Sequence, residues 1–172
     1  MSAHDHPHDK PIVMIEHDAF ENAFNRLYEE TMNLIEETAA YIDQNGKLAT
    51  RDLSVETSAL YVKEAMYLST RLMQIASRLL LFRAGREEEM LPEQIEKEIA
   101  KISLHTPSLG PDIAHWQELP EIFRSFVTRS LSLEKRVYHM HYDSDYVSSK
   151  SLEDKNPVNK QLELLKNAFR HF

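Results

Sequence analysis

Residues 54–88 carry two adjacent apolar helical stripes, and this pattern limits the fold more than any other part of the chain. Both stripes advance at the three- and four-residue steps that keep side chains on one side of an α-helix. One stripe consists of Ala59, Val62, Met66, Ser69, Met73, Ala76 and Leu80, and the other of Tyr61, Ala65, Leu68, Leu72, Ile75, Leu79 and Phe82. A helix that is apolar this far round has to be covered on more than one side. We therefore expect it to be the central element of a helical fold.

A second long helix is predicted over residues 18–46. Asp18 and Glu21 have the spacing of a capping box at a helix start, and Gly46 is expected to end the helix in the left-handed conformation. The apolar positions again share one face and are Phe20, Phe24, Leu27, Leu34 and Tyr41, with Tyr28, Ile35 and Ile42 beside them.

A third long helix is predicted to begin at Leu119-Pro120, because proline is favoured at the first helical position. Its apolar face repeats at alternating steps of four and three, which is the spacing of a bundle seam. The face consists of Leu119, Phe123, Phe126, Ser130, Leu133, Val137 and Met140. We expect an all-α fold: an antiparallel three-helix bundle with short accessory helices, one of which is allowed by the apolar spacing within residues 91–104.

The predicted organisation has three parts. Residues 1–17 form a flexible N-terminal arm, residues 18–142 form the helical bundle domain, and residues 143–172 form a flexible linker and a C-terminal amphipathic segment. The linker is rich in Ser, Asp and Lys, and the segment after it carries one narrow apolar stripe that includes Leu162, Leu165 and Phe169. Such a segment either docks on the bundle or binds a partner groove.

Composition excludes several classes of function. The chain has 3 glycines and lacks the glycine-rich motifs of nucleotide-binding and hydrolase sites. It has no cysteine, which excludes disulfides and thiolate metal sites. The net charge of −8 disfavours nucleic acid as a partner. No membrane span is expected, because polar residues interrupt even the most apolar stretch, residues 72–82, and no signal peptide is visible. We expect a cytoplasmic protein.

The histidines are the strongest candidates for metal ligands or catalytic residues, but the sequence supports neither role well. His4, His6 and His8 lie in the predicted arm, which offers no fixed coordination geometry. His139 and His141 are followed by Asp143 and Asp145, but side chains two residues apart on a helix point apart. A histidine phosphotransfer module would need an exposed histidine in the middle of a long helix, and the two early helices offer none after His17. We expect no catalytic residues, no metal and no cofactor.

Arg71 and Arg78 are seven residues apart on the central helix and could together hold a carboxylate. Pairing with a surface acid or with a neighbouring helix is the more common use of such residues.

Two segments resemble the family named for the regulator of CtrA degradation (RcdA) of alphaproteobacteria. The first is EAMYLSTRLMQIASRLLLFRAGREEEM at residues 64–90, and the second is LPEIFRSFVTRSLSLEKRVYHMH at residues 119–141. The chain departs from the family pattern at Arg78, where a large aromatic residue is expected, and in its histidine-rich helix end. The resemblance covers roughly residues 18–142.

The resemblance implies a homodimeric three-helix bundle that acts as an adaptor for regulated proteolysis. Its partners would be a response-regulator-like adaptor, the ClpXP protease system and cargo proteins that regulate the cell cycle. A helical signalling or scaffold protein unconnected with proteolysis is the alternative, and a metal-dependent enzyme is a more distant one.

The apolar surface of residues 72–82 extends around most of the predicted helix. This independently favours a homodimer, because one layer of neighbouring helices would leave part of that surface exposed. The candidate dimer or partner contacts are Met73, Leu80, Leu81 and Phe82 on the central helix and Leu162, Leu165 and Phe169 in the C-terminal segment.

Overall fold

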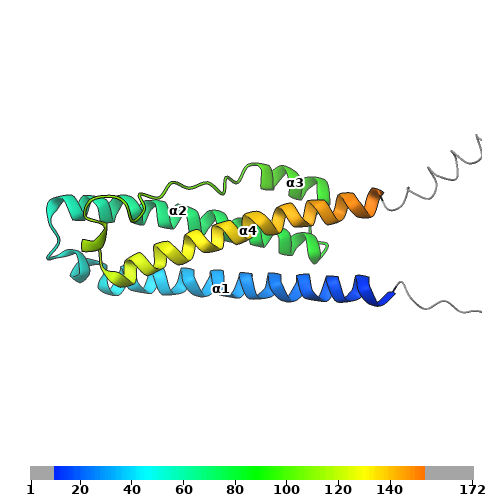
Figure 1. Cartoon of the computed structure of the whole chain (residues 1–172), viewed down its shortest axis with the longest axis horizontal. Coiled ribbons are helices and arrows are strands. Elements are labelled where there is room, and N and C mark those ends of the chain that lie inside the picture. Colours follow the sequence, from blue (N-terminus) through cyan, green and yellow to red (C-terminus); the bar gives the residue numbers. More distant parts are fainter. Residues whose placement is uncertain (1–9, 154–172) are drawn as a thin grey trace, which may run out of the picture. The chain divides into compact units, whose positions relative to one another are not determined.

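The computed structural model describes the backbone of residues 10–153 and the side chains of residues 18–140. The elements are α1 (Lys10–Thr50), α2 (Val55–Arg86), α3 (Pro92–Ala100), a short 3-10 helix η1 (Trp116–Glu118) and α4 (Glu121–Glu153) (Figure 1). No strand occurs in residues 10–153, so the prediction of an all-α fold is confirmed. The chain divides into two compact units, residues 1–134 and 135–172, and the packing described below belongs to the first.

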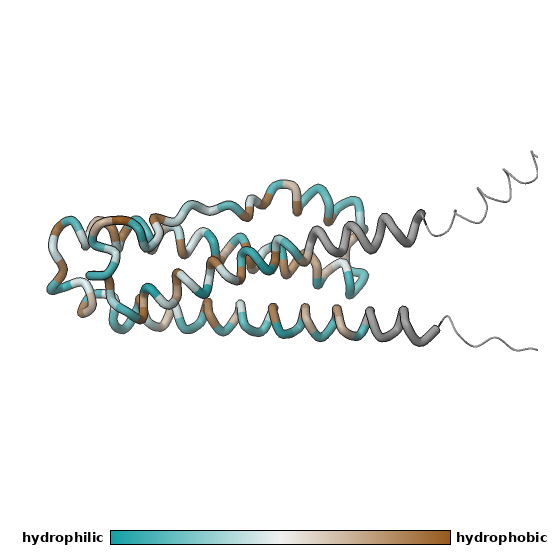
Figure 2. The backbone as a smooth tube through the Cα atoms, in the orientation of Figure 1, coloured by the Kyte–Doolittle hydropathy of each residue, from teal (hydrophilic) through white to brown (hydrophobic). Residues whose placement is uncertain are grey.

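The core of the first unit lies between α1, α2 and the first part of α4. Tyr61 of α2 packs on Phe123 of α4 with ring centroids 4.3 Å apart, and Tyr41 of α1 meets the edge of Phe126 at 5.5 Å. Apolar residues recur at helical intervals along α1 and α2 (Figure 2). The fully buried aliphatic side chains include Leu34, Leu68, Ile75, Leu79, Val127 and Leu133.

The direction of α4 differs from the predicted antiparallel bundle. Contacts between α1 and α4 run in opposite senses, since Glu37 meets Arg129 while Tyr41 meets Phe126. Contacts between α2 and α4 run in the same sense, from Tyr61–Phe123 to Arg71–Ser130. The parallel α2–α4 pair is possible because residues 101–115 form no helix and return along α2, with residues 102–110 extended and turns at residues 111–115 (Figure 1). At roughly 3.3 Å per residue, residues 102–110 span about 30 Å, a distance that takes a helix about 20 residues.

Several predicted boundaries are confirmed. Ser54 caps α2 by accepting a hydrogen bond from the Thr57 backbone N–H at 3.1 Å. The amphipathic spacing in residues 91–104 corresponds to α3, and Pro120 immediately precedes α4. Gly85 allows α3 to lie close to α2, because a Cβ there would come within 2.5 Å of the Ile95 side chain.

Other boundaries were wrong. α1 begins at Lys10, so Asp18 is not its cap and residues 10–17 are not a separate arm. The helix also passes through Gly46 to Thr50, and the Thr50 hydroxyl donates to the Gly46 carbonyl at 2.9 Å. α4 continues through residues 143–153, where a linker was predicted. No helix in the described part of the chain is long and apolar enough to cross a membrane.

Candidate protein-binding surfaces

An apolar stripe on α2 faces outward along almost the whole helix. We call Val55, Ala59, Val62, Met66, Ser69, Met73, Ala76 and Leu80 the exposed stripe. Its large members are strongly exposed: Val62 by 58%, Met66 by 67% and Met73 by 71%. The positions advance by alternating steps of four and three, the spacing with which two helices pair. None of the eight is charged, although charged residues make up 28% of the chain. The stripe is therefore a candidate interface.

The predicted contact residues do not all share this surface. Met73 and Leu80 belong to the exposed stripe. Leu81 and Phe82 are partly buried, and their helical positions point to other sides of α2. The remaining predicted contacts, Leu162, Leu165 and Phe169, lie outside the described residues.

The opposite side of α2 holds a buried cluster of charges. Arg71 and Glu64 are completely buried and Glu134 of α4 nearly so. The Arg71 guanidinium lies 3.9 Å from Glu64 and 3.8 Å from Glu134, and it donates to the Ser130 hydroxyl at 2.9 Å. Burial lowers the pKa of Arg71, while the Glu134 and Glu64 carboxylates act to raise it. One buried cation thus lies between two carboxylates.

These charges hold residues 101–115, which we call the strap and of which residues 102–110 are extended. Arg71 donates to the Pro107 carbonyl at 2.9 Å. Glu64 accepts from the Ser108 hydroxyl and from the Leu109 backbone N–H, both at 2.8 Å. The strap has no helix of its own, so side chains of the long helices satisfy part of its backbone. The charge cluster fixes the path of the chain between α3 and α4.

Two further residues extend this attachment. Glu134 accepts from the Thr106 backbone N–H at 3.2 Å, and Arg78 donates to the Ile102 carbonyl at 3.1 Å. Pairing with a neighbouring helix, which we considered the more common use of such residues, is observed for Arg71, which pairs with Glu134 of α4. Arg71 pairs with carboxylates, and Arg78 binds a strap carbonyl where the family pattern predicts an aromatic residue.

Glu64 and Glu134 were not identified as site residues from the sequence, although a signal exists. Glu64 and Arg71 lie four residues before and three residues after Leu68, which is fully buried. Both therefore fall on the buried side of the helix, where charges need partners.

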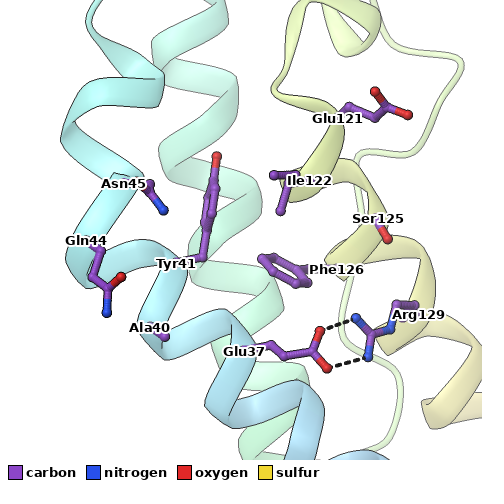
Figure 3. A pocket seen from close by; sticks show the side chains of 10 residues that line it. All are labelled: Glu37, Ala40, Tyr41, Gln44, Asn45, Glu121, Ile122, Ser125, Phe126 and Arg129. Carbon is purple, nitrogen blue, oxygen red and sulfur yellow. Dashed lines mark hydrogen bonds and ion pairs between the residues drawn. The ribbon is translucent and has the colours of Figure 1, made fainter.

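A cleft lies between α1 and α4 at the end of the unit near η1 (Figure 3). Its volume is about 570 Å³. Tyr41 and Phe126 form an aromatic floor, and Ile122 lies beside them with 58% of its surface exposed. The ion pair of Glu37 and Arg129 closes one end. The lining residues are Glu37, Ala40, Tyr41, Gln44, Asn45, Glu121, Ile122, Ser125, Phe126 and Arg129.

The ion pair at the end of the cleft is bidentate. Arg129 Nη1 donates to Glu37 Oε2 at 2.5 Å, and Arg129 Nη2 donates to Oε1 at 3.1 Å. The hydrogen bond from Arg129 lowers the pKa of Glu37, and the same bond raises the pKa of Arg129. Burial raises the pKa of Tyr41 above its ordinary value of 10.0.

No group of three or more metal-ligating side chains occurs among residues 18–140. The Thr57 hydroxyl donates to Glu118, and His115 pairs with the same carboxylate at 2.8 Å; both hydrogen bonds lower the pKa of Glu118. These contacts attach η1 to α2.

The fold and its surfaces define a small all-helical protein in which buried charges fix a crossing strap and an apolar stripe faces outward. A family model described as a protein of unknown function (DUF1465) matches residues 15–169, and the chain belongs to this family. The crystal structure of RcdA from Caulobacter crescentus CB15 is similar to it, at 40% identity and a TM-score of 0.57. The similarity covers 69% of this chain and 87% of the other. The predicted resemblance to the RcdA family is thus confirmed. No curated protein matches the chain.

Proposed function

We propose that this protein is a non-enzymatic adaptor that binds regulatory proteins and helps deliver them to the ClpXP protease in the cytoplasm. The observation that carries the proposal is the 40% identity to RcdA over most of both chains. The exposed stripe of α2 supports it, because an uncharged surface of this length suits contact with protein. The partners implied by the resemblance are a response-regulator-like adaptor, the protease and cell-cycle regulators as cargo.

We further propose that the working form is a homodimer of three-helix bundles joined through the exposed stripe. Large residues such as Met66 and Met73 alternate in the stripe with small ones such as Ser69 and Ala76. This alternation allows two copies of α2 to approach closely across a two-fold axis, which is the commonest symmetry of homo-oligomers. Met73 and Leu80 would lie in the interface. Leu81, Phe82 and the C-terminal Leu162, Leu165 and Phe169 remain candidate contacts for other partners.

Light scattering tests the dimer. The expected mass is twice the chain mass of 20.1 kDa. Met73→Glu should reduce it to the monomer without loss of helical content, because Met73 is exposed within one chain. Ile122→Glu is the matched control: its side chain is also exposed, but it lies on α4, away from the exposed stripe. A wild-type monomer at micromolar concentration would overturn the dimer, and dimeric Met73→Glu would overturn the assigned interface.

Affinity purification from an alphaproteobacterial host tests the adaptor function. Protease subunits or response regulators should be recovered with the tagged chain. Recovery of signalling proteins alone, with no protease subunit at any stage, would favour the alternative of a scaffold unconnected with proteolysis.

A further inference from the structure

Two methionines lie near the middle of the exposed stripe of α2. Met66 and Met73 are seven residues apart, which is two helical turns or about 10 Å along the helix, so both are on the same face. Within one chain their side chains are 67% and 71% exposed. Both thioethers are therefore open to small oxidants in solution.

Methionine carries all the sulfur of this protein, because the chain has 7 methionines and no cysteine. Among the side chains that the structure describes, Met32, Met90 and Met140 are half-buried, whereas Met66 and Met73 are exposed. No thiol is present to react first, and susceptibility to oxidation follows exposure. A mild oxidant should therefore act on Met66 and Met73 before it acts on the three half-buried methionines.

Oxidation would change the chemistry of the exposed stripe. A methionine sulfoxide replaces a flexible apolar side chain with a polar, chiral one, and its oxygen accepts hydrogen bonds. Within the stripe only Ser69 has a side-chain donor. The hydroxyl of the neighbouring Thr70 already donates to the Met66 carbonyl at 2.9 Å. A sulfoxide buried between two such stripes would lack hydrogen-bond partners, which disfavours their pairing.

We propose that Met66 and Met73 are a reversible oxidation site that controls pairing through the exposed stripe. A sulfur lone pair attacks one oxygen of hydrogen peroxide, so that an S–O bond forms and the O–O bond breaks. The proton of the attacked oxygen moves to the leaving oxygen, which departs as water. The sulfur loses two electrons and the peroxide gains them. Methionine sulfoxide reductases reverse the step with thiols as the electron source and release the oxygen as water.

This inference rests on the proposed homodimer and adds a control to it. A copy that covers the stripe shields both thioethers, whereas the dissociated chain exposes them. Oxidation therefore acts on the dissociated chain, and the sulfoxides keep that chain from pairing again. The rate of oxidation at Met66 and Met73 should fall as the protein concentration rises.

Treatment of the full-length protein with millimolar hydrogen peroxide tests the site. Peptide mass spectrometry should find one added oxygen at Met66 and at Met73 before Met32 and Met90 react. Light scattering should show the dimer Kd rising at least about a hundredfold, because a fully oxidised dimer would bury four sulfoxides. Circular dichroism should show unchanged helical content. Methionine sulfoxide reductases A and B with dithiothreitol should restore the original Kd.

Two double variants separate this site from general oxidative damage. Met66→Leu with Met73→Leu keeps an apolar stripe of similar volume and should stay dimeric in peroxide. Met32→Leu with Met90→Leu is the matched control and should dissociate in peroxide as the wild type does. Earlier oxidation of Met32 or Met90, equal dissociation of the two double variants, or no recovery with the reductases would overturn the proposal.

The oxidation proposal and the homodimer can fail separately. If the untreated chain is monomeric at every concentration and its oxidation rate does not depend on concentration, the homodimer fails and the control of pairing fails with it. If the untreated chain forms a dimer whose Kd is unchanged after complete oxidation of Met66 and Met73, the oxidation proposal fails alone.

Discussion

The buried charge cluster makes Arg71→Met the most informative single substitution. Methionine fills a similar space but removes the cation from between Glu64 and Glu134. It also removes the donors to the Ser130 hydroxyl and to the Pro107 carbonyl. Two carboxylates, one almost and one completely buried, would then lie close together without their common partner.

The expected loss of unfolding free energy is large because the Glu64 and Glu134 carboxylates that remain are buried away from water. Breaking a buried ion pair by removing one partner costs about 3–5 kcal/mol. For a chain of this length, one kcal/mol corresponds to about 2–4 °C in melting temperature. The variant should therefore melt roughly 6–20 °C below the wild type. Arg83→Met is the control, because Arg83 is half exposed in its pair with Glu87, and water screens such a surface pair so that its loss should be much smaller.

Urea unfolding followed by circular dichroism measures the loss of unfolding free energy in Arg71→Met and in Arg83→Met. Hydrogen exchange adds a local readout, since the Thr106 and Leu109 amides donate to Glu134 and Glu64. Both amides should exchange faster in Arg71→Met than global unfolding alone explains, because the strap loses its anchor. If Arg71→Met costs no more free energy of unfolding than Arg83→Met, the cluster does not hold the fold as we infer.

Three smaller effects are expected at other contacts. Gly46→Ala should stabilise α1 by about 0.5–1 kcal/mol in thermal melts, because the new Cβ would make only an ordinary 3.6 Å contact with the Tyr61 hydroxyl. Ser54→Ala should cost about 1 kcal/mol by removing the α2 cap. NMR titration should find Glu37 ionising below its ordinary pKa of 4.5 and returning toward it in Arg129→Ala. The Glu37 contribution to stability is present above that value and is lost as the pH falls through the lowered pKa.

The sequence predicted the three long helices because their apolar positions repeat over many turns. It could not show which apolar stripe of α2 faces outward, since both have the composition of a core. The choice depends on where α1 and α4 pack, and Tyr61 and Leu68 are buried while Val62 and Met66 are exposed.

The misplaced helix ends have a similar explanation. Gly46 is a strong local stop signal, but packing of this turn near Tyr61 overrides the local preference. The orientation of α4 was missed because the strap carries no periodic pattern. The available sequence signal was that Glu64 and Arg71 lie on the same side of α2 as Leu68. Charges on that side need polar partners, so a polar segment has to cover it.

A reconstituted degradation reaction tests the proposal that the protein delivers other proteins to ClpXP. Purified ClpXP is mixed with a cargo protein recovered by affinity purification, with and without the wild-type chain, and the loss of cargo is followed over time. We expect the chain to accelerate degradation only while it binds the cargo, and we expect that it is not consumed in proportion to the cargo degraded. An unchanged degradation rate, with the cargo bound to the chain and the protease active on a control substrate, would contradict the adaptor function.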